Sequence, residues 1–134
     1  MKFLQRCELI RFIGKISRKE VNELYGKSRA GIVIYQPAKN HFESQPIKLF
    51  EFMAAGLPVV ASSFPLWQGF VEDTKCGICV DPTDAEAVKK ACLFLLDNPK
   101  EAEEMGKAGH ESVINKYNWN VEGKKLLDLY ADLI

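Results

Sequence analysis

Two glutamates and a lysine stand close together in the chain and could form a polar binding site. Glu43 and Glu51 are separated by seven residues, and Lys48 lies three positions before Glu51. Residues three apart share one face of a helix, so Lys48 and Glu51 are expected to be neighbours. Ionised carboxylates are strong, directional acceptors for hydroxyl groups. The charges therefore indicate either a polar ligand or an internal Lys48–Glu51 ion pair.

The predicted helix that carries Lys48 and Glu51 is almost wholly apolar. Pro46 suits the first turn of a helix, Gly56 suits the position just past its end, and Pro58 prevents its continuation. The other residues of this helix are mostly apolar, as in helices that are buried on all sides. Charges inside such a helix need partners, because an unpaired buried charge is costly.

Strands and helices are predicted to alternate along the whole chain. Short apolar runs predict strands at 9–13, 31–35, 57–61 and 77–80, and a polar loop at 36–44. Capping boxes at Ser17–Glu20 and Thr83–Glu86 predict helix starts, and two further helices are expected to begin at Pro65 and after Asn98. A last amphipathic helix is predicted from an apolar stripe formed by Leu126, Leu129, Tyr130 and Leu133. This order predicts an α/β fold with a parallel sheet of about four strands and helices on both faces. Ligands bind such sheets beyond the carboxyl ends of the strands, where the loop with Glu43 is expected.

The composition fits one soluble domain spanning residues 1–134. Hydrophobic residues make up 47% and charged residues 27% of the chain, and 18 basic residues balance 18 acidic ones. The balance gives no reason to expect nucleic acid as a partner. No apolar run is long enough to cross a membrane, and the first residues are too short in their apolar part for a signal peptide, so we expect a cytoplasmic protein. The single pair Cys76–Cys79 is only half a zinc site, and we expect neither a metal nor a cofactor.

The segment from Glu43 to Ser62 resembles the retaining glycosyltransferases of the GT-B fold, family 4, also called group 1. Their donor-binding half carries Glu-x7-Glu followed by Ala-x-Gly-x-Pro-Val-Val-Ala-Ser, and this chain has Glu43-x7-Glu51 and then Ala54-Ala55-Gly56-Leu57-Pro58-Val59-Val60-Ala61-Ser62. The string from Gln45 to Gly56 is similar to the bacterial surface-polysaccharide branch. The resemblance covers nearly the whole chain and implies a Rossmann-like, partial C-terminal half of a GT-B fold.

The resemblance implies a role for each candidate site residue. Glu51 would accept hydrogen bonds from the ribose of a nucleoside diphosphate sugar, and Glu43, the implied catalytic residue, would contact the transferred hexosyl group. Lys48 could reach a phosphate. The backbone amides of Ser44, Gln45 and Ile47 would approach the sugar or the diphosphate at the helix N-terminus. The family pattern has Gly-Phe-Gly after the first Glu, whereas this chain has Ser44-Gln45-Pro46, and Pro46 donates no amide.

The resemblance also implies that important parts lie outside this chain. The first donor-domain strand with its phosphate-binding cations and the N-terminal acceptor domain would both precede Met1. We therefore expect the chain alone to be inactive, although the whole enzyme would transfer a hexosyl group, with retention, to a glycan or lipid-linked acceptor. The whole enzyme would be cytoplasmic or peripheral at the inner face of the cell membrane. The missing GT-B half and, through the last helix, a second copy are the expected protein partners.

Two other hypotheses remain open. A flavodoxin-like, non-catalytic binding or signalling module would share the predicted fold. A phosphoacceptor module of that kind needs an acidic cluster at the strand ends, where this chain has Gln36, Ser62 and a lone Asp81. The other hypothesis is a structural chain that only pairs with another chain.

Overall fold

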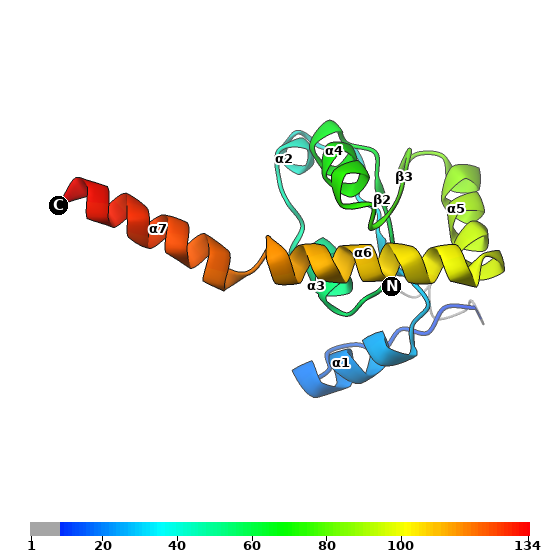
Figure 1. Ribbon diagram of the computed structural model, residues 1–134. Coiled ribbons are helices and arrows are strands. Elements are labelled where there is room, and N and C mark those ends of the chain that lie inside the picture. The colour runs from blue at the N-terminus through cyan, green and yellow to red at the C-terminus, as the bar shows by residue number, and fades with distance from the viewer. Residues whose placement is uncertain (1–8) are drawn as a thin grey trace.

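The protein folds into an α/β domain with a long helical extension, shown in Figure 1. The structure, a computed structural model, describes residues 9–134. Its strands are β1 (Gly31–Val33), β2 (Val59–Ser62) and β3 (Gly77–Val80). Its helices are α1 (Arg18–Lys27), α2 (Lys39–Phe42), α3 (Ile47–Ala54), α4 (Pro65–Thr74), α5 (Ala85–Asp97), α6 (Pro99–Asn115) and α7 (Trp119–Leu133).

The three strands form a parallel sheet in the order β1-β2-β3. In its register, Val59 on the central strand pairs with Gly31 on β1 and with Gly77 on β3. All four residues of β2 are buried, as expected for the central strand of a parallel sheet covered on both sides. The expected α/β class and the parallel sheet are thus confirmed.

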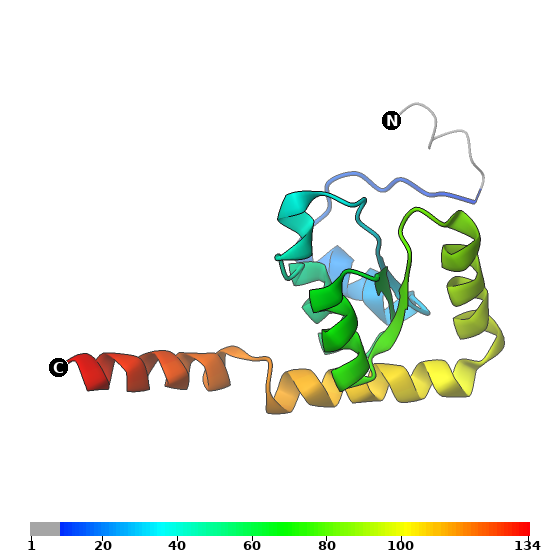
Figure 2. The same cartoon turned by 90° about the horizontal axis from the view of Figure 1, so that it is seen from above.

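Alternate residues of β2 contribute to two separate hydrophobic clusters, one on each face of the sheet. Val59 and Ala61 pack with residues of α3 and α4, whereas Val60 packs with residues of α5 and the start of α6. Helix α6 passes the amino ends of β2 and β3, where Gly106 lies against Gly56. In Figure 2 this helix runs along one edge of the domain. Because α6 covers the amino edge, the loops that follow the strands are at the opposite edge.

Helix α3 begins and ends as the sequence indicates, but it is less buried than expected. Pro46 is its N-cap in an extended conformation, and Gly56 adopts a positive φ of 71° just past its end. Glycine suits that left-handed position because it has no β-carbon to clash. Leu49 and Met53 face the core, whereas Ile47 on the opposite side is 76% exposed. The prediction of a helix buried on all sides is therefore wrong, since one face of α3 lies outside the core.

Three further predictions about local structure are corrected. Residues 9–13 form no strand, and the described sheet has three strands instead of about four. A strand needs a hydrogen-bonded neighbour, and among the described residues β1 pairs only with β2. The predicted loop 36–44 contains the short helix α2. The cap of α5 is Asp84, which accepts from the amides of Glu86 and Ala87, and not Thr83. The expectations for residues 1–7 lie outside the described residues.

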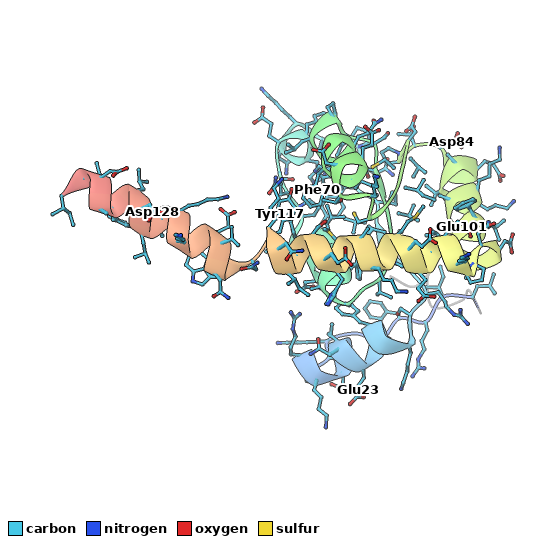
Figure 3. The ribbon with its side chains drawn as sticks, viewed as in Figure 1. Glu23, Phe70, Asp84, Glu101, Tyr117 and Asp128 are labelled. Atoms are coloured by element: carbon cyan, nitrogen blue, oxygen red, sulfur yellow. The ribbon has the colours of Figure 1, made fainter. Side chains whose placement is uncertain are left out.

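The two terminal helices are the least embedded in the domain. Neither α1 nor α7 contains a buried residue, although the capping box of α1 forms as predicted. Helix α7 extends away from the body in both Figure 1 and Figure 2. The body ends at the C-terminal end of α6. Just beyond that end, Tyr117 packs edge-on against Phe70 of α4, with 4.8 Å between the ring centroids (Figure 3).

Candidate functional site

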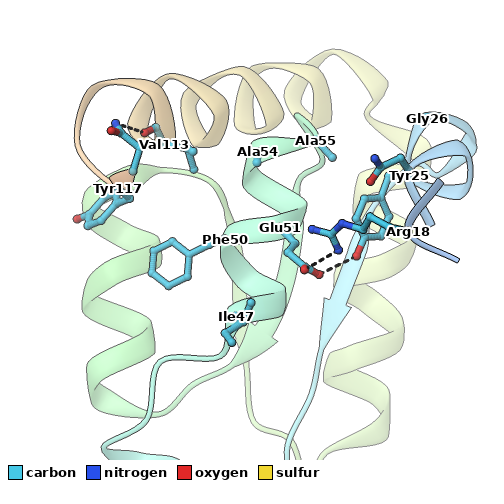
Figure 4. A pocket seen from close by; sticks show the side chains of 12 residues that line it. Arg18, Tyr25, Gly26, Ile47, Phe50, Glu51, Ala54, Ala55, Val113 and Tyr117 are labelled. Carbon is cyan, nitrogen blue, oxygen red and sulfur yellow. Dashed lines mark hydrogen bonds and ion pairs between the residues drawn. The ribbon is translucent and has the colours of Figure 1, made fainter. Parts of the chain in front are cut away.

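The carboxylate of Glu51 is at the centre of a polar cluster that joins α3 to α1. Arg18 Nη1 donates to Glu51 Oε1 at 2.8 Å, and Lys48 Nζ donates to Glu51 Oε2 at 2.7 Å. The hydroxyl of Tyr25 also donates to Oε2, at 3.0 Å. Figure 4 shows Arg18 and Tyr25 reaching Glu51 from α1. Both carboxylate oxygens therefore have partners within the protein.

The donors around Glu51 hold it in its ionised form. The hydrogen bond from Lys48 is the largest cause, followed by the one from Arg18, and together they lower the pKa of Glu51 from 4.5 to about 2. Partial burial of the carboxyl group opposes the shift. The same contacts raise the pKa of Lys48 and of Arg18. Two cations facing one anion leave the cluster with a net positive charge at neutral pH.

A cavity of about 660 Å³ opens beside Glu51, between α1, α3 and the end of α6. Its walls are mostly apolar and include Arg18, Asn22, Tyr25, Ile47, Phe50, Glu51, Val113 and Tyr117. Figure 4 shows Glu51 and Arg18 on one side of this cavity, and Phe50 and Tyr117 on the other. An apolar cavity with a few converging polar groups is the usual form of a small-molecule site.

The loop between β1 and α3 carries the other candidate residues. Glu43 is the C-cap of α2 and is exposed, and Gln45 is exposed as well. Ser44 is half-buried, and its carbonyl oxygen accepts a hydrogen bond of 2.6 Å from the indole nitrogen of Trp67. Within residues 9–134, the backbone amides of Ser44, Gln45 and Ile47 make no hydrogen bond to the protein. These amides lie at or just before the start of α3.

The structure brings some of the predicted site residues together and leaves others apart. Lys48 and Glu51 form the ion pair that their spacing indicated, while Ile47 and Glu51 line the cavity. Glu43, Ser44 and Gln45 lie on the preceding loop and do not line it.

Arg18 and Tyr25 were not predicted as partners of Glu51. Their seven-residue spacing does place them on one face of α1, which was the only signal in the sequence.

The histidines, cysteines and carboxylates of the described residues form no cluster with the make-up of a metal site. Residues 9–134 contain no group of three or more His, Cys, Asp or Glu side chains that could hold a metal ion. Burial raises the pKa of the Cys76 thiol, and it raises that of Cys79 to about 12, so neither is a reactive thiolate at neutral pH. No helix in the described part is long and apolar enough to cross a membrane.

Comparison with known proteins identifies the family of this chain. The family model for glycosyl transferases group 1 matches residues 3–112. A GDP-mannose-dependent α-(1-6)-phosphatidylinositol monomannoside mannosyltransferase of Mycolicibacterium smegmatis is 36% identical over 66% of this chain and 23% of its own length. A phosphatidyl-myo-inositol mannosyltransferase of Mycobacterium leprae is 33% identical over 92% of this chain and 32% of its own length.

The structure of sucrose-phosphate synthase from Thermosynechococcus elongatus is also similar. It matches 92% of this chain and 30% of its own chain, with a TM-score of 0.80 and 29% sequence identity. The chain thus spans less than a third of the length of each of these relatives.

Proposed function

This chain belongs to the glycosyl transferases of group 1, and we propose that it is the part of such an enzyme that binds the nucleoside diphosphate sugar. Its fold is part of a GT-B fold. The observation that carries the proposal is the Glu51 carboxylate, ionised and held at the wall of an open cavity. The relatives whose names mention GDP-mannose support a nucleoside diphosphate sugar as the donor.

Glu51 binds the ribose of the donor in this proposal. A carboxylate has about four acceptor positions, and three of those on Glu51 are occupied by Arg18, Lys48 and Tyr25. Two ribose hydroxyls therefore use the remaining position on Oε1 and displace one of the present partners. Arg18 is the easier partner to displace, since its side chain is more exposed than that of Lys48. Lys48 stays beside the start of α3, where it can contact a phosphate.

The loop before α3 binds the diphosphate and the sugar. The unpaired amides of Ser44, Gln45 and Ile47 donate to anionic or hydroxyl oxygens, because the N-terminus of a helix attracts negative charge. Glu43 is exposed on this loop and contacts the transferred hexosyl group. The reaction proceeds with retention at the anomeric carbon. Stabilisation of the leaving phosphate is its main electrostatic task and requires cations from the family's upstream region.

The whole enzyme contains a second, N-terminal half that binds a glycan or lipid-linked acceptor. Relatives named for phosphatidylinositol substrates support a lipid-linked acceptor. We place the whole enzyme in bacterial surface-polysaccharide synthesis, in the cytoplasm or at the inner face of the membrane. No cofactor takes part.

Exposed apolar residues on α7 favour self-association of this chain when it is alone. The comparisons give no support to a flavodoxin-like signalling module.

A binding screen on the purified chain tests the proposal. We expect uridine or guanosine diphosphate and their sugars to raise the melting temperature, with a dissociation constant around millimolar, which corresponds to about 4 kcal/mol. The affinity is weak because the upstream cations are absent from the chain. We expect no glycosyl transfer. Failure of every nucleotide to bind at ten millimolar would contradict the proposal, and transfer by the chain alone would contradict the expected inactivity.

A further inference from the structure

Trp67 makes a specific polar contact with the loop that carries Glu43, Ser44 and Gln45, although its sequence context indicates a packing residue. Its side chain is 1% exposed on α4, and its indole N–H donates to the carbonyl oxygen of Ser44 at 2.6 Å. It is the only side chain in the described structure that donates to the backbone of residues 43–46. This contact ties the predicted site loop directly to the core.

The contact with Trp67 determines the direction of the next amide. The Ser44–Gln45 peptide bond is trans, as are all peptide bonds of the described residues. In a trans peptide the C=O and the following N–H point in opposite directions. Since the carbonyl of Ser44 points at the buried indole, the N–H of Gln45 points away from the core. Gln45 is exposed, and its amide has no acceptor among the described residues.

The indole itself is held by its surroundings. The ring of Trp67 packs edge-on against those of Tyr35 and Phe64, with 5.3 Å and 5.0 Å between the ring centroids. The backbone of Tyr35 is in turn fixed by the hydroxyl of Ser62 on β2, which accepts from its amide and donates to its carbonyl. Trp67 and Phe64 are buried and Tyr35 lies at the surface, and the packing of these three rings holds the N–H of Trp67 in one direction.

We propose that Trp67 is a positioning residue that orients the Ser44–Gln45 peptide so that the Gln45 amide donates to the diphosphate or sugar of the bound donor. This inference rests on the proposed function, because it concerns the same loop and ligand. Trp67 does not touch the ligand. It acts by removing the alternative peptide orientation, in which the carbonyl oxygen of Ser44 would face an anionic ligand and repel it.

The test compares ligands that do and do not reach the loop. Trp67→Phe keeps an aromatic ring in the cluster and removes the N–H donor. We expect it to weaken binding of GDP-mannose or UDP-glucose, whichever the wild-type chain binds, by about three- to tenfold, which is the range for one hydrogen bond. Binding of the matching nucleoside, measured by the same titration, should be unchanged, because the nucleoside reaches Glu51 and not the loop.

Trp119→Phe is the matched control, since Trp119 is 74% exposed and makes no side-chain hydrogen bond in the described structure. It should change neither affinity. If Trp67→Phe does not fold, benzothienylalanine at position 67 in a Trp119→Phe background replaces the indole N–H by sulfur at nearly constant shape. Unchanged sugar-nucleotide affinity would overturn the inference. An equal loss for nucleoside and sugar nucleotide would overturn it too, because it would indicate general damage to the fold.

A ligand-free measurement separates this inference from the proposed function. The amide nitrogen of Gln45 is bonded to the Ser44 carbonyl carbon, so both NMR resonances report the hydrogen bond from Trp67. Removal of the indole N–H should shift both resonances, whereas Trp119→Phe should shift neither. If the wild-type chain binds no nucleotide, the proposed function fails, and these shifts still decide whether Trp67 orients the peptide. Resonances that stay in place would contradict that orientation.

Discussion

At the scale of single residues, Glu51 has two possible roles that share one geometry. Its partners Arg18 and Tyr25 come from a helix with no buried residue, so the cluster fastens α1 to the domain. The same carboxylate faces the cavity and can accept hydrogen bonds from a ligand. Fastening α1 would make Glu51 important for stability, whereas ribose binding would make it important for affinity.

The stability contribution of Glu51 should depend on pH. Its pKa is about 2 in the folded protein against an ordinary value of 4.5. A lowered carboxyl pKa gives stability that is present above pH 4.5 and is lost as the pH falls towards 2. We expect Glu51→Gln to reduce the free energy of unfolding by on the order of 1 kcal/mol at pH 7, because exposed partners weaken the pairs. Urea unfolding at several pH values should show this difference vanish near pH 2. A difference that does not vary with pH would contradict the assignment.

The sequence indicated only part of this cluster. The Lys48–Glu51 pair could be predicted because a helix places residues three apart on one face. The contacts with Arg18 and Tyr25 span 33 and 26 positions of the chain. They depend on how α1 docks against α3, which no local pattern specifies. The Trp67–Ser44 contact was missed for the same reason, since it links two elements 23 positions apart.

At the scale of elements, α3 is positioned by its close approach to α6. Gly106 on α6 lies against Gly56, at the end of α3, and a β-carbon at Gly106 would overlap the carbonyl oxygen of Gly56. On the same helix, Nδ1 of His110 lies 2.9 Å from the carbonyl oxygen of Ala54. These contacts fix the end of the helix that carries Glu51.

Gly106→Ala should therefore destabilise the protein. The added methyl group forces α6 away from the end of α3, and such overpacking costs about 1–3 kcal/mol. Gly69→Ala is the matched control, because a β-carbon at Gly69 on α4 meets nothing within 4 Å. Helix propensity predicts that this control is neutral or stabilising by up to about 1 kcal/mol. Chemical unfolding of both variants decides the matter, and equal stabilities would contradict the described packing.

Elements with strong local signals were predictable, and elements that depend on partners were not. Helix α1 and strand β3 have the predicted bounds, because a capping box and a short apolar run define them locally. Residues 9–13 are apolar enough for a strand but pair with no described strand. Helix α2 was missed because four residues are too few to show a helical period.

At the scale of the whole molecule, α7 leaves a row of apolar side chains without cover. Leu126, Leu129, Tyr130 and Leu133 were predicted to form one stripe, and all four are exposed. The stripe itself follows from helical periodicity. Whether another part of the protein covers it could not be predicted from the sequence of the helix, because that depends on what the helix packs against.

We expect the purified chain to self-associate through α7 as its concentration rises. Leu129→Lys combined with Leu133→Lys should shift the molecular mass measured by light scattering towards that of the monomer, because charged side chains cannot be buried between apolar stripes without cost. Leu93→Lys serves as the control, since Leu93 is an exposed leucine on α5 and is not part of the stripe. A wild-type chain that remains monomeric at millimolar concentration would rule out this association.

The central claim, that Glu51 binds the ribose of a nucleotide donor, is tested most directly by calorimetric titration of Glu51→Ala with the preferred nucleoside diphosphate. Removal of charged hydrogen bonds should weaken binding by about ten- to a hundredfold, with Glu51→Gln between the variant and the wild type. Glu103→Ala, which removes an exposed glutamate paired with Lys107, should bind like the wild type. Melting curves count the folded protein in each sample. If Glu51→Ala binds the nucleotide as tightly as the wild type once folded protein is counted, Glu51 only fastens α1 to α3 and the claim is wrong.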